Sequence, residues 1–457
     1  MEKNQKRRLV MYIAGLFAAV IAVLIFAYFW YTSFSNIIIK PFYRKGNWLV
    51  ILIYAIFILV FFRLYGGFKY GFLTTTNIIY SQALGVFLSN VIMYLQIALF
   101  ARKFTNLGTV LMMTAIQILI LVVYSVLANN LYYALYPPRH MIIVYGSSLA
   151  DSLIAKMSKR KEKYKVCASV SALESLDTIY EKISGYESVI LCDIKSETRN
   201  KVLKFCFDRS IRVYVTPKIS DIIMRGADDI NLFDTPLLLC RNRGLTFEQR
   251  FIKRAGDIFM SSVGIIILSP IMLVTAIIIK LYDGGPVLYK QKRSTIGGRV
   301  FEIYKFRSMI VDAEKKSGAV LASRHDDRIT PVGKVIRRYR IDEFPQLFNI
   351  LLGDMSVVGP RPERPEIGEK YAKEMPEFRY RLKVKAGLTG YAQVVGKYDT
   401  TAYDKLKMDM MYIEDYSLFL DIKLIMMTIK TMFQKDSSQG VTDERGIGNK
   451  EEEKKSE

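Results

Sequence analysis

Long stretches without a charged residue dominate the first third of this 457-residue chain. They cover residues 9–31, 46–62, 78–101 and the interval 104–138. Each approaches the ~20 apolar residues that an α-helix needs to cross the hydrocarbon core of a bilayer. They are too long and too apolar for the helices of an ordinary soluble core. The sequence therefore predicts a membrane protein with an α-helical N-terminal bundle of four transmembrane helices over 1–138.

The basic residues around these stretches bear on their orientation. Lys3, Lys6, Arg7 and Arg8 precede the first stretch, which favours a cytoplasmic N-terminus. Basic residues at 40–45 in the next loop weaken that signal. Four spans place both ends of the region on the same side, so we expect the rest of the chain in the cytoplasm.

Composition excludes several kinds of chemistry. The formal net charge of +22 predicts a surface that attracts phosphates, nucleic acid or anionic lipid headgroups, and charge alone does not choose among them. Two histidines are too few for histidine-rich metal sites. The four cysteines show no zinc-type pairing, which fits thiols in a reducing compartment better than a disulfide framework.

From residue 139 the pattern changes to short apolar runs separated by polar, helix-compatible stretches. The runs are 141–145, 165–170, 188–192 and 211–215. This alternation is typical of βαβ units, so we predict a central α/β Rossmann-like domain over 139–245. The turn after the first run has only Gly146 where a dinucleotide fingerprint needs three glycines, which argues against cofactor binding there. The remaining candidate roles of this domain are scaffolding, regulation and oligomer contact.

A fifth uncharged segment covers 258–279 and contains Ser269-Pro270 near its middle. Because proline lacks a backbone donor and restricts the residue before it, we expect a sharp bend there. Basic residues flank the segment on both sides, at Lys253, Arg254 and Lys280. This favours a re-entrant helix that enters and leaves by the cytoplasmic face over a proline-kinked spanning helix, which is the alternative.

Two adjacent acids, Asp342 and Glu343, stand between a helical pattern over 332–339 and Pro345, which suits the first turn of a new helix. The positive end of a helix dipole favours ionised carboxylates. An ionised carboxylate can attack phosphorus or ligate Mg²⁺. By itself such a pair is also the ordinary start of a solvated helix.

Basic residues surround these acids in the sequence. Arg337, Arg338 and Arg340 lie within one turn upstream, and Arg361 lies in the rigid turn 358–362. The stretch 379–385 alternates basic and apolar residues, so we interpret it as a strand with Arg379, Arg381, Lys383 and Lys385 on one face. Its basic face is either a solvated surface or a phosphate-attracting wall. Lys305 and Arg307 follow an alternating run at 300–304 and are further candidates for binding an anion.

Several of these motifs occur together in the order found in one known family. They are Lys253-Arg254 with Asp257, Ser269-Pro270, the stretch 305–309, Asp342-Glu343-Phe344-Pro345-Gln346, the stretch 359–362 and the stretch 387–393. Over roughly 247–433 the chain resembles the bacterial sugar transferase family of monotopic polyprenyl phosphate sugar-1-phosphate transferases. The upstream arrangement resembles the longer members, which initiate capsule, exopolysaccharide or O-antigen synthesis.

The resemblance implies a role for each matching position. Asp342 is then the nucleophile that forms an aspartyl-phosphosugar intermediate, and Glu343 assists it and its Mg²⁺. Arg361 lies near the nucleotide, and Ser269-Pro270 breaks the re-entrant helix. Phe344 stands where leucine is commoner, an apolar exchange that leaves the chemistry unchanged. The implied substrates are a UDP-sugar and undecaprenyl phosphate, and the implied location is the bacterial inner (cytoplasmic) membrane with a cytoplasmic catalytic domain.

We therefore expect a mainly helical α/β catalytic domain at 246–435 and a disordered charged tail at 436–457, with a homodimer through the central domain as a further expectation. Alternatives are a polytopic transferase with its site among the N-terminal spans, an inactive nucleotide-binding sensor, and nucleic-acid binding. The spans contain no acidic residue, the acid pair is intact, and no nucleic-acid module is recognisable. The candidate site residues are Asp342 and Glu343 as catalytic and metal-binding groups, and Lys305, Arg307, Arg337, Arg361 and Arg379 as substrate-binding groups.

Overall fold

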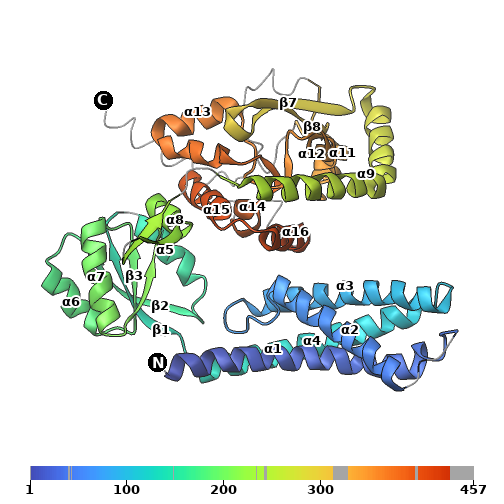
Figure 1. Ribbon diagram of the computed structural model, residues 1–457, viewed down its shortest axis with the longest axis horizontal. Helices are drawn as coiled ribbons and strands as arrows, with labels where there is room; N and C mark the ends of the chain where they lie inside the picture. Colours follow the sequence, from blue (N-terminus) through green and yellow to red (C-terminus); the bar gives the residue numbers. More distant parts are fainter. Residues whose placement is uncertain are drawn as a thin grey trace. The chain divides into compact units, whose positions relative to one another are not determined.

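The computed structural model divides the chain into two compact units, Met1–Lys218 and Ile219–Glu457 (Figure 1). It describes residues 2–39, 42, 44–147, 149–232, 234–240, 244–311, 328–396 and 400–432. The charged tail predicted at 436–457 lies outside the described residues.

The first unit begins with four long helices and a short π-helical turn. They are α1 (Glu2–Phe29), η1 (Trp30–Phe34), α2 (Arg44–Tyr65), α3 (Thr75–Ala101) and α4 (Leu107–Leu135). Four stretches in this region are long and apolar enough to cross a membrane, at Lys6–Phe34, Lys45–Tyr65, Thr75–Ala101 and Leu107–Leu135. The length and apolar composition of these helices confirm the predicted helical membrane region.

Neutral polar side chains are buried between these helices. The Gln117 amide donates to the Tyr54 hydroxyl at 2.9 Å and to the Ala22 carbonyl at 2.8 Å. The Asn90 amide donates to the Gln117 carbonyl oxygen and to Thr114, both at 2.8 Å. A polar group in hydrocarbon is costly unless it has such a partner, so these bonds fix which helix faces meet.

The remainder of this unit is a four-stranded sheet with helices on both faces. The strands pair in the order β2-β1-β3-β4, and every neighbouring pair is parallel. Apolar residues of α6 and α7 pack against one face and those of α5 against the other. The βαβ pattern predicted from the sequence is therefore confirmed. The elements are β1 (Arg139–Tyr145), α5 (Leu149–Ser158), β2 (Tyr164–Ser171), α6 (Leu176–Ser184), β3 (Ser188–Cys192), α7 (Ser196–Asp208) and β4 (Arg212–Val215).

Gly146 has a packing role in this sheet. A Cβ atom at this position would lie 2.1 Å from the Asp193 carbonyl oxygen, so any side chain would collide with the backbone that follows β3. The single glycine of the turn is thus explained by close approach of two strand ends, without any ligand.

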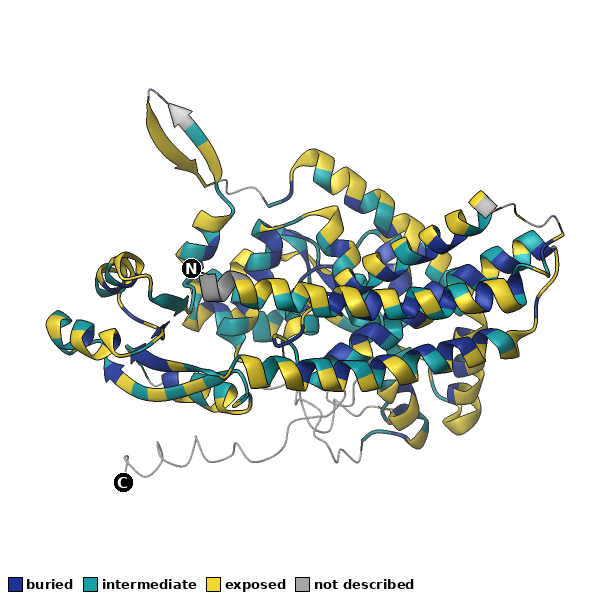
Figure 2. Ribbon diagram, turned by 90° about the horizontal axis from the view of Figure 1, so that it is seen from below, coloured by how far each residue is buried: buried dark blue, intermediate teal, exposed yellow. Residues whose placement is uncertain are grey.

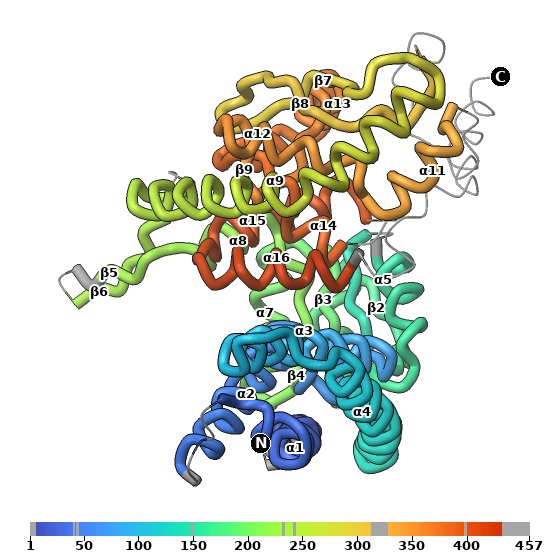
Figure 3. Tube along the Cα trace, turned by 90° about the vertical axis from the view of Figure 1, so that its right-hand side faces the viewer, coloured from blue at the N-terminus to red at the C-terminus, as the bar shows by residue number. Residues whose placement is uncertain are grey.

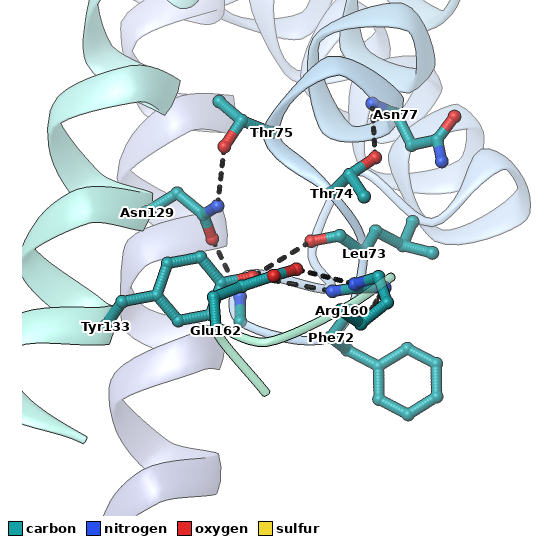
Figure 4. Close-up of polar contacts among 10 residues, drawn as sticks. Phe72, Leu73, Thr74, Thr75, Asn77, Asn129, Tyr133, Arg160 and Glu162 are labelled. Atoms are coloured by element: carbon teal, nitrogen blue, oxygen red, sulfur yellow. Dashed lines mark hydrogen bonds and ion pairs between the residues drawn. The ribbon is translucent and has the colours of Figure 1, made fainter. Parts of the chain in front are cut away.

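The sheet contacts the helical bundle through the segment before β2. Arg160 donates to the Phe72 carbonyl at 3.1 Å in the loop between α2 and α3, and its Nε lies 2.6 Å from Glu162 (Figure 4). The Lys163 ammonium lies 3.5 Å from the centre of the Phe72 ring. Since both partners of each contact belong to the first unit, the bundle and the sheet are joined at this loop.

The second unit contains the remaining elements. A hairpin of β5 and β6 projects from it, and most of its described residues are exposed (Figure 2). Helix α8 packs with α15 in one apolar cluster. The elements are α8 (Ile219–Arg225), β5 (Asp228–Leu232), β6 (Thr235–Leu239), α9 (Phe247–Asp283), β7 (Leu288–Ser294), η2 (Ile296–Gly298), β8 (Val300–Phe306), α11 (Pro331–Arg338), η3 (Ile341–Glu343), α12 (Gln346–Leu352), β9 (Ser356–Val358), α13 (Pro365–Glu374), η4 (Pro376–Lys383), β10 (Gly387–Thr389), α14 (Tyr391–Val395), α15 (Ala402–Glu414) and α16 (Leu418–Met432).

The long helix α9 contains the fifth apolar segment and carries Pro270 in its interior. Figures 1 and 3 show that its axis bends partway along, as expected, although the backbone stays helical throughout. Pro270 offers no N–H to the Ile266 carbonyl four residues earlier. The Ser269 hydroxyl donates to that carbonyl at 2.8 Å instead. The Ser-Pro pair therefore bends the helix while it keeps this carbonyl satisfied.

The interpretation of 379–385 as a strand is wrong. Residues Pro376–Lys383 form the 3₁₀-helix η4. Phe378, Arg381 and Val384 are all buried, and their spacing of three residues matches the 3₁₀ repeat. The alternation of basic and apolar letters concealed this period because Arg381, a charged residue, is one of the buried positions.

Candidate functional site

The two acids predicted to be catalytic lie in a tight turn between two helices. Helix α11 starts at a Thr330 cap, whose hydroxyl accepts from the Gly333 N–H, with Pro331 in its first turn. It ends before Arg340, which has a positive φ of 55°. A left-handed conformation is uncommon for a residue with a side chain, so the surrounding structure must hold it. The chain then passes through η3, which contains Asp342 and Glu343, into α12.

Three cationic side chains from different elements surround Glu343. Arg361 Nη2, after β9, lies 3.0 Å from Glu343 Oε1, and Lys305 Nζ, on β8, lies 3.5 Å from the same oxygen. Arg340 Nη1 lies 3.9 Å from Glu343 Oε2. Burial alone would raise the pKa of Glu343, but the charges of Arg361 and Lys305 outweigh it and hold this pKa far below its usual range. Glu343 is therefore an ionised carboxylate whose charge is already balanced.

Asp342 has a different environment, although it is the adjacent residue. Within the described part of the chain, its carboxylate makes no hydrogen bond or ion pair. Burial raises the pKa of Asp342, the neighbouring charge of Glu343 raises it further, and the net pKa is about 6. The positive charges of Lys305, Arg337 and Arg361 act in the opposite direction. At neutral pH this carboxylate is mostly ionised and has free oxygens for a reaction.

The cations respond to the same environment. Burial lowers the pKa of Lys305, and the opposite charge of Glu343 works against this effect. The Glu343 charge raises the pKa of Arg361. Arg361 therefore stays protonated and can present a positive charge to an incoming phosphate.

Of the five predicted substrate-binding residues, the structure brings Lys305, Arg337 and Arg361 to the acid pair and leaves two elsewhere. Arg307 is buried and paired with Asp283 at the end of α9. Arg379 is exposed on η4, and no hydrogen bond or ion pair joins it to the described residues of the cluster.

Two residues of the cluster, Arg340 and Gln393, are not among the candidate site residues predicted from the sequence. Arg340 belongs to the upstream basic run but is set apart by its backbone conformation. The Gln393 side-chain oxygen accepts from Arg361 Nη1 at 3.3 Å. The sequence offered one signal for Gln393, because it belongs to the stretch 387–393, one of the motifs shared with the family. The spacing of that motif along the chain does not reveal that Gln393 contacts Arg361.

The acid pair fits one kind of metal site. Among the described residues, no group of three or more His, Cys, Asp or Glu side chains gathers as a complete site. Mg²⁺ commonly binds to one or two carboxylates and takes its other ligands from water and substrate phosphates. Asp342 offers free carboxylate oxygens for this purpose, whereas Glu343 is already engaged by cations. The donor set therefore fits a magnesium ion that arrives with a phosphate substrate.

Comparison with known proteins places this site in a family. Residues 248–435 match the family described as bacterial sugar transferase. The chain is 47% identical over 185 residues to a UDP-N-acetylgalactosamine-undecaprenyl-phosphate N-acetylgalactosaminephosphotransferase of Aeromonas hydrophila, covering 40% of this chain and 44% of the relative. It is 38% identical over 260 residues to a UDP-glucose:undecaprenyl-phosphate glucose-1-phosphate transferase of Klebsiella pneumoniae, covering 56% and 54%.

The match spans about half the length of these two relatives and nearly all of a shorter one. The exopolysaccharide production protein PSS of Rhizobium leguminosarum bv. phaseoli is 39% identical over 186 residues, which cover 39% of this chain and 93% of the relative. The chain belongs to the bacterial sugar transferase family.

Proposed function

We propose that this protein is an undecaprenyl-phosphate sugar phosphotransferase, which moves a hexose 1-phosphate from a UDP-sugar to undecaprenyl phosphate. The observation that carries the proposal is the contrast within the acid pair: Glu343 is held by Arg361 and Lys305, while Asp342 is ionisable and lacks a partner among the described residues. In a member of this family, that contrast supports Asp342 as the nucleophile. The product would begin the synthesis of a capsule, an exopolysaccharide or an O-antigen.

The proposed reaction has two displacements. An Asp342 carboxylate oxygen attacks the sugar-bearing phosphorus of the donor, an Asp–O–P bond forms, and the bond to the departing UMP breaks. A phosphate oxygen of undecaprenyl phosphate then attacks the same phosphorus, which restores the carboxylate and releases the lipid diphosphosugar. A carboxylate suits this role because the acyl phosphate that it forms is reactive enough to pass the group onward. Arg361, Lys305 and Arg337 offset charge on the transferring phosphate.

Mg²⁺ is the proposed cofactor, held by the acid pair together with the donor pyrophosphate. Asp342 would contribute most of the protein's share, because Glu343 is engaged by Arg361 and Lys305. When bound, the ion would neutralise negative charge on the pyrophosphate. This follows the common pattern in which magnesium keeps few protein ligands.

The transferred sugar has three candidates, two of which come from the names of relatives. One relative is named for N-acetylgalactosamine and another for glucose, and the former has the higher identity to this chain. We therefore place UDP-N-acetylgalactosamine first and UDP-glucose second as donors, with UDP-galactose as a third.

Contacts within the second unit support a re-entrant path for α9. Near its start, Asp257 accepts hydrogen bonds from the Ser356 hydroxyl and the Val357 N–H, both at 2.9 Å. At its end, Asp283 pairs with Arg307 of the same unit. A straight helix would separate the two aspartates by about 40 Å, more than the ~30 Å hydrocarbon core. Because one folded unit binds both ends of α9, the contacts are best explained if the two ends of the helix lie on the same membrane face.

This topology is testable by cysteine labelling. Single cysteines placed just before Ile258 and just after Lys280 should both be protected from an impermeant reagent in intact cells. Reaction at the second position alone would show a spanning helix. We place the catalytic unit on the cytoplasmic face of the bacterial inner membrane. We assign the helical bundle and the Rossmann-like domain the role of positioning this unit. The Rossmann-like domain is also the proposed contact surface of a homodimer.

The direct test uses purified full-length protein with Mg²⁺. A panel of UDP-sugars is supplied with undecaprenyl phosphate, and release of UMP is measured. With labelled donor and no lipid, label should remain on the peptide that contains Asp342, and adding undecaprenyl phosphate should remove it. Label on another peptide, or transfer without a trapped intermediate and with full activity in Asp342→Asn, would support direct attack by the lipid phosphate instead.

A further inference from the structure

The buried pair of Arg381 and Asp409 lies next to the proposed site but contributes no atom to it. Arg381, on η4, has a relative exposure of 6%, and Asp409, on α15, has 1%. Arg381 Nε and Nη2 lie 3.1 and 2.9 Å from the same Asp409 carboxylate oxygen. Burying two charges is costly unless both are well bonded, and removing one leaves the other unpaired. A pair this deeply buried therefore holds its two elements in a defined arrangement.

Arg381 also bonds to the turn that carries Arg361. Its Nη2 donates to the Arg361 main-chain carbonyl at 2.9 Å, and its Nη1 lies 3.5 Å from the Glu363 carboxylate. These two contacts grip the turn on both sides of Pro362. Pro360 and Pro362 already restrict the backbone on either side of Arg361. The main chain at Arg361 is thus fixed both by its own sequence and by a guanidinium from another element.

The opposite end of Arg361 reaches the acid pair. Its Nη2 lies 3.0 Å from Glu343 Oε1, and its Nη1 donates to Gln393. The contacts therefore form one chain: Asp409 holds Arg381, Arg381 holds the Arg361 backbone, and the Arg361 side chain holds Glu343. An arginine aimed by its backbone loses less freedom when it binds a phosphate than one on a mobile loop.

We propose that Arg381, held by Asp409, is a positioning residue that aims the Arg361 guanidinium at Glu343 and at the donor pyrophosphate. The inference deepens the proposed function and rests on it, because it assigns a role in presenting a cation to the substrate. Arg381 does not itself touch the reacting atoms. The burial that raises the pKa of Asp409 to about 6 despite its arginine partner shows that this pair is maintained against a desolvation cost.

The competing explanation is a pair that only stabilises the fold. The buried pair Lys253–Asp421 provides a matched control, with side-chain exposures of 6% and 9% and a 2.6 Å contact. Its described contacts include none to Arg361. A purely structural role predicts that both pairs behave alike, whereas positioning predicts that only Arg381 and Asp409 depend on Arg361.

The test is a double-mutant comparison in the full-length protein, scored by kcat and KM for UMP release. Asp409→Asn keeps the shape and removes the charge, and Arg361→Lys keeps a charge but loses the forked geometry. In the native background, Asp409→Asn should lower kcat about tenfold or more. In the Arg361→Lys background, its effect should nearly vanish, because the group that it aims is gone. Asp421→Asn should lower kcat by the same factor in both backgrounds.

Arg381→Lys keeps the test decisive if Asp409→Asn does not fold. Lysine retains the charge beside Asp409 but lacks a planar fork that reaches both Asp409 and the Arg361 carbonyl. The variant should keep its thermal midpoint within a few degrees and still lose activity in an Arg361-dependent way. Equal factors in both Arg361 backgrounds, or native kcat in Arg381→Lys, would overturn the proposal. Failure of the proposed function would appear separately, as absence of UMP release in the native protein.

Discussion

The two units of this protein bury polar side chains of different kinds. Between the helices of the first unit, the buried polar groups are neutral, and Tyr54, Asn90 and Gln117 satisfy one another. The second unit also buries neutral polar groups, but in addition it buries charged pairs, as in Lys253–Asp421 and Arg381–Asp409. The acid pair differs from these charged pairs, because Glu343 has cationic partners while Asp342 has none among the described residues.

This difference shows that buried polar side chains serve two purposes, one in helix packing and one in the chemistry of the site. A neutral network with every partner supplied internally specifies how helices pack in a membrane but offers nothing to a phosphate. Buried charge pairs hold elements in register at a desolvation cost, and they can leave one ionised group available. Variants that exchange or remove these groups should therefore affect activity in the second unit and stability in the first.

The largest effect is expected from Asp342→Asn. The amide keeps the shape of the side chain but removes the nucleophilic charge, so donor cleavage and transfer should each fall on the order of 10³-fold or more. UMP release and transfer of label to lipid measure the two steps. Near-normal transfer by this variant would show that the unpaired carboxylate is not the reacting group.

Arg361→Ala should have the next largest effect. Loss of the guanidinium leaves Glu343 with weaker partners and removes a cation from the site, so kcat/KM should fall about 10²-fold. Arg379→Ala is the control variant. The sequence predicts that Arg379 binds substrate, whereas the structure places this residue exposed on η4. A loss comparable to that of Arg361→Ala would show that Arg379 does bind substrate.

The pH dependence should report the contrast within the acid pair. Attack requires ionised Asp342, and its pKa is raised to about 6, so kcat/KM should be full above this value and fall about tenfold per pH unit below it. Arg337→Gln removes a charge that lowers this pKa, and the acid limb should move to higher pH. An acid limb near pH 4 in both proteins would indicate an ordinary aspartate.

The smallest effect on activity is expected from Gln117→Leu in the bundle. This change removes hydrogen bonds to Tyr54, Asn90 and the Ala22 carbonyl, and it should cost about 1 kcal/mol of unfolding free energy in detergent. Leu119→Ala, at an exposed position of the same helix, is the matched control and should cost less. A large loss of kcat in a well-folded Gln117→Leu protein would mean that the neutral network participates in transfer.

Local signals explain which parts of the fold were predictable. The membrane helices and the parallel strands follow from the length and spacing of apolar runs, and the bend in α9 follows from Pro270. The strand at 379–385 was mispredicted because Arg381 is buried by a partner on α15, and a local pattern contains no information about that partner. Helix α8 similarly packs with α15, which lies far along the chain.

The sequence alone determined the kinds of groups available to this protein and most of the elements that carry them. It placed Asp342 and Glu343 together before α12 and surrounded them with basic residues, because adjacency and helix boundaries are local properties. Only the tertiary structure decided which acid is neutralised and which remains available. Lys305 and Arg361 come from separate elements to reach Glu343, and the environment of each carboxylate depends on burial and on charges that are distant in sequence.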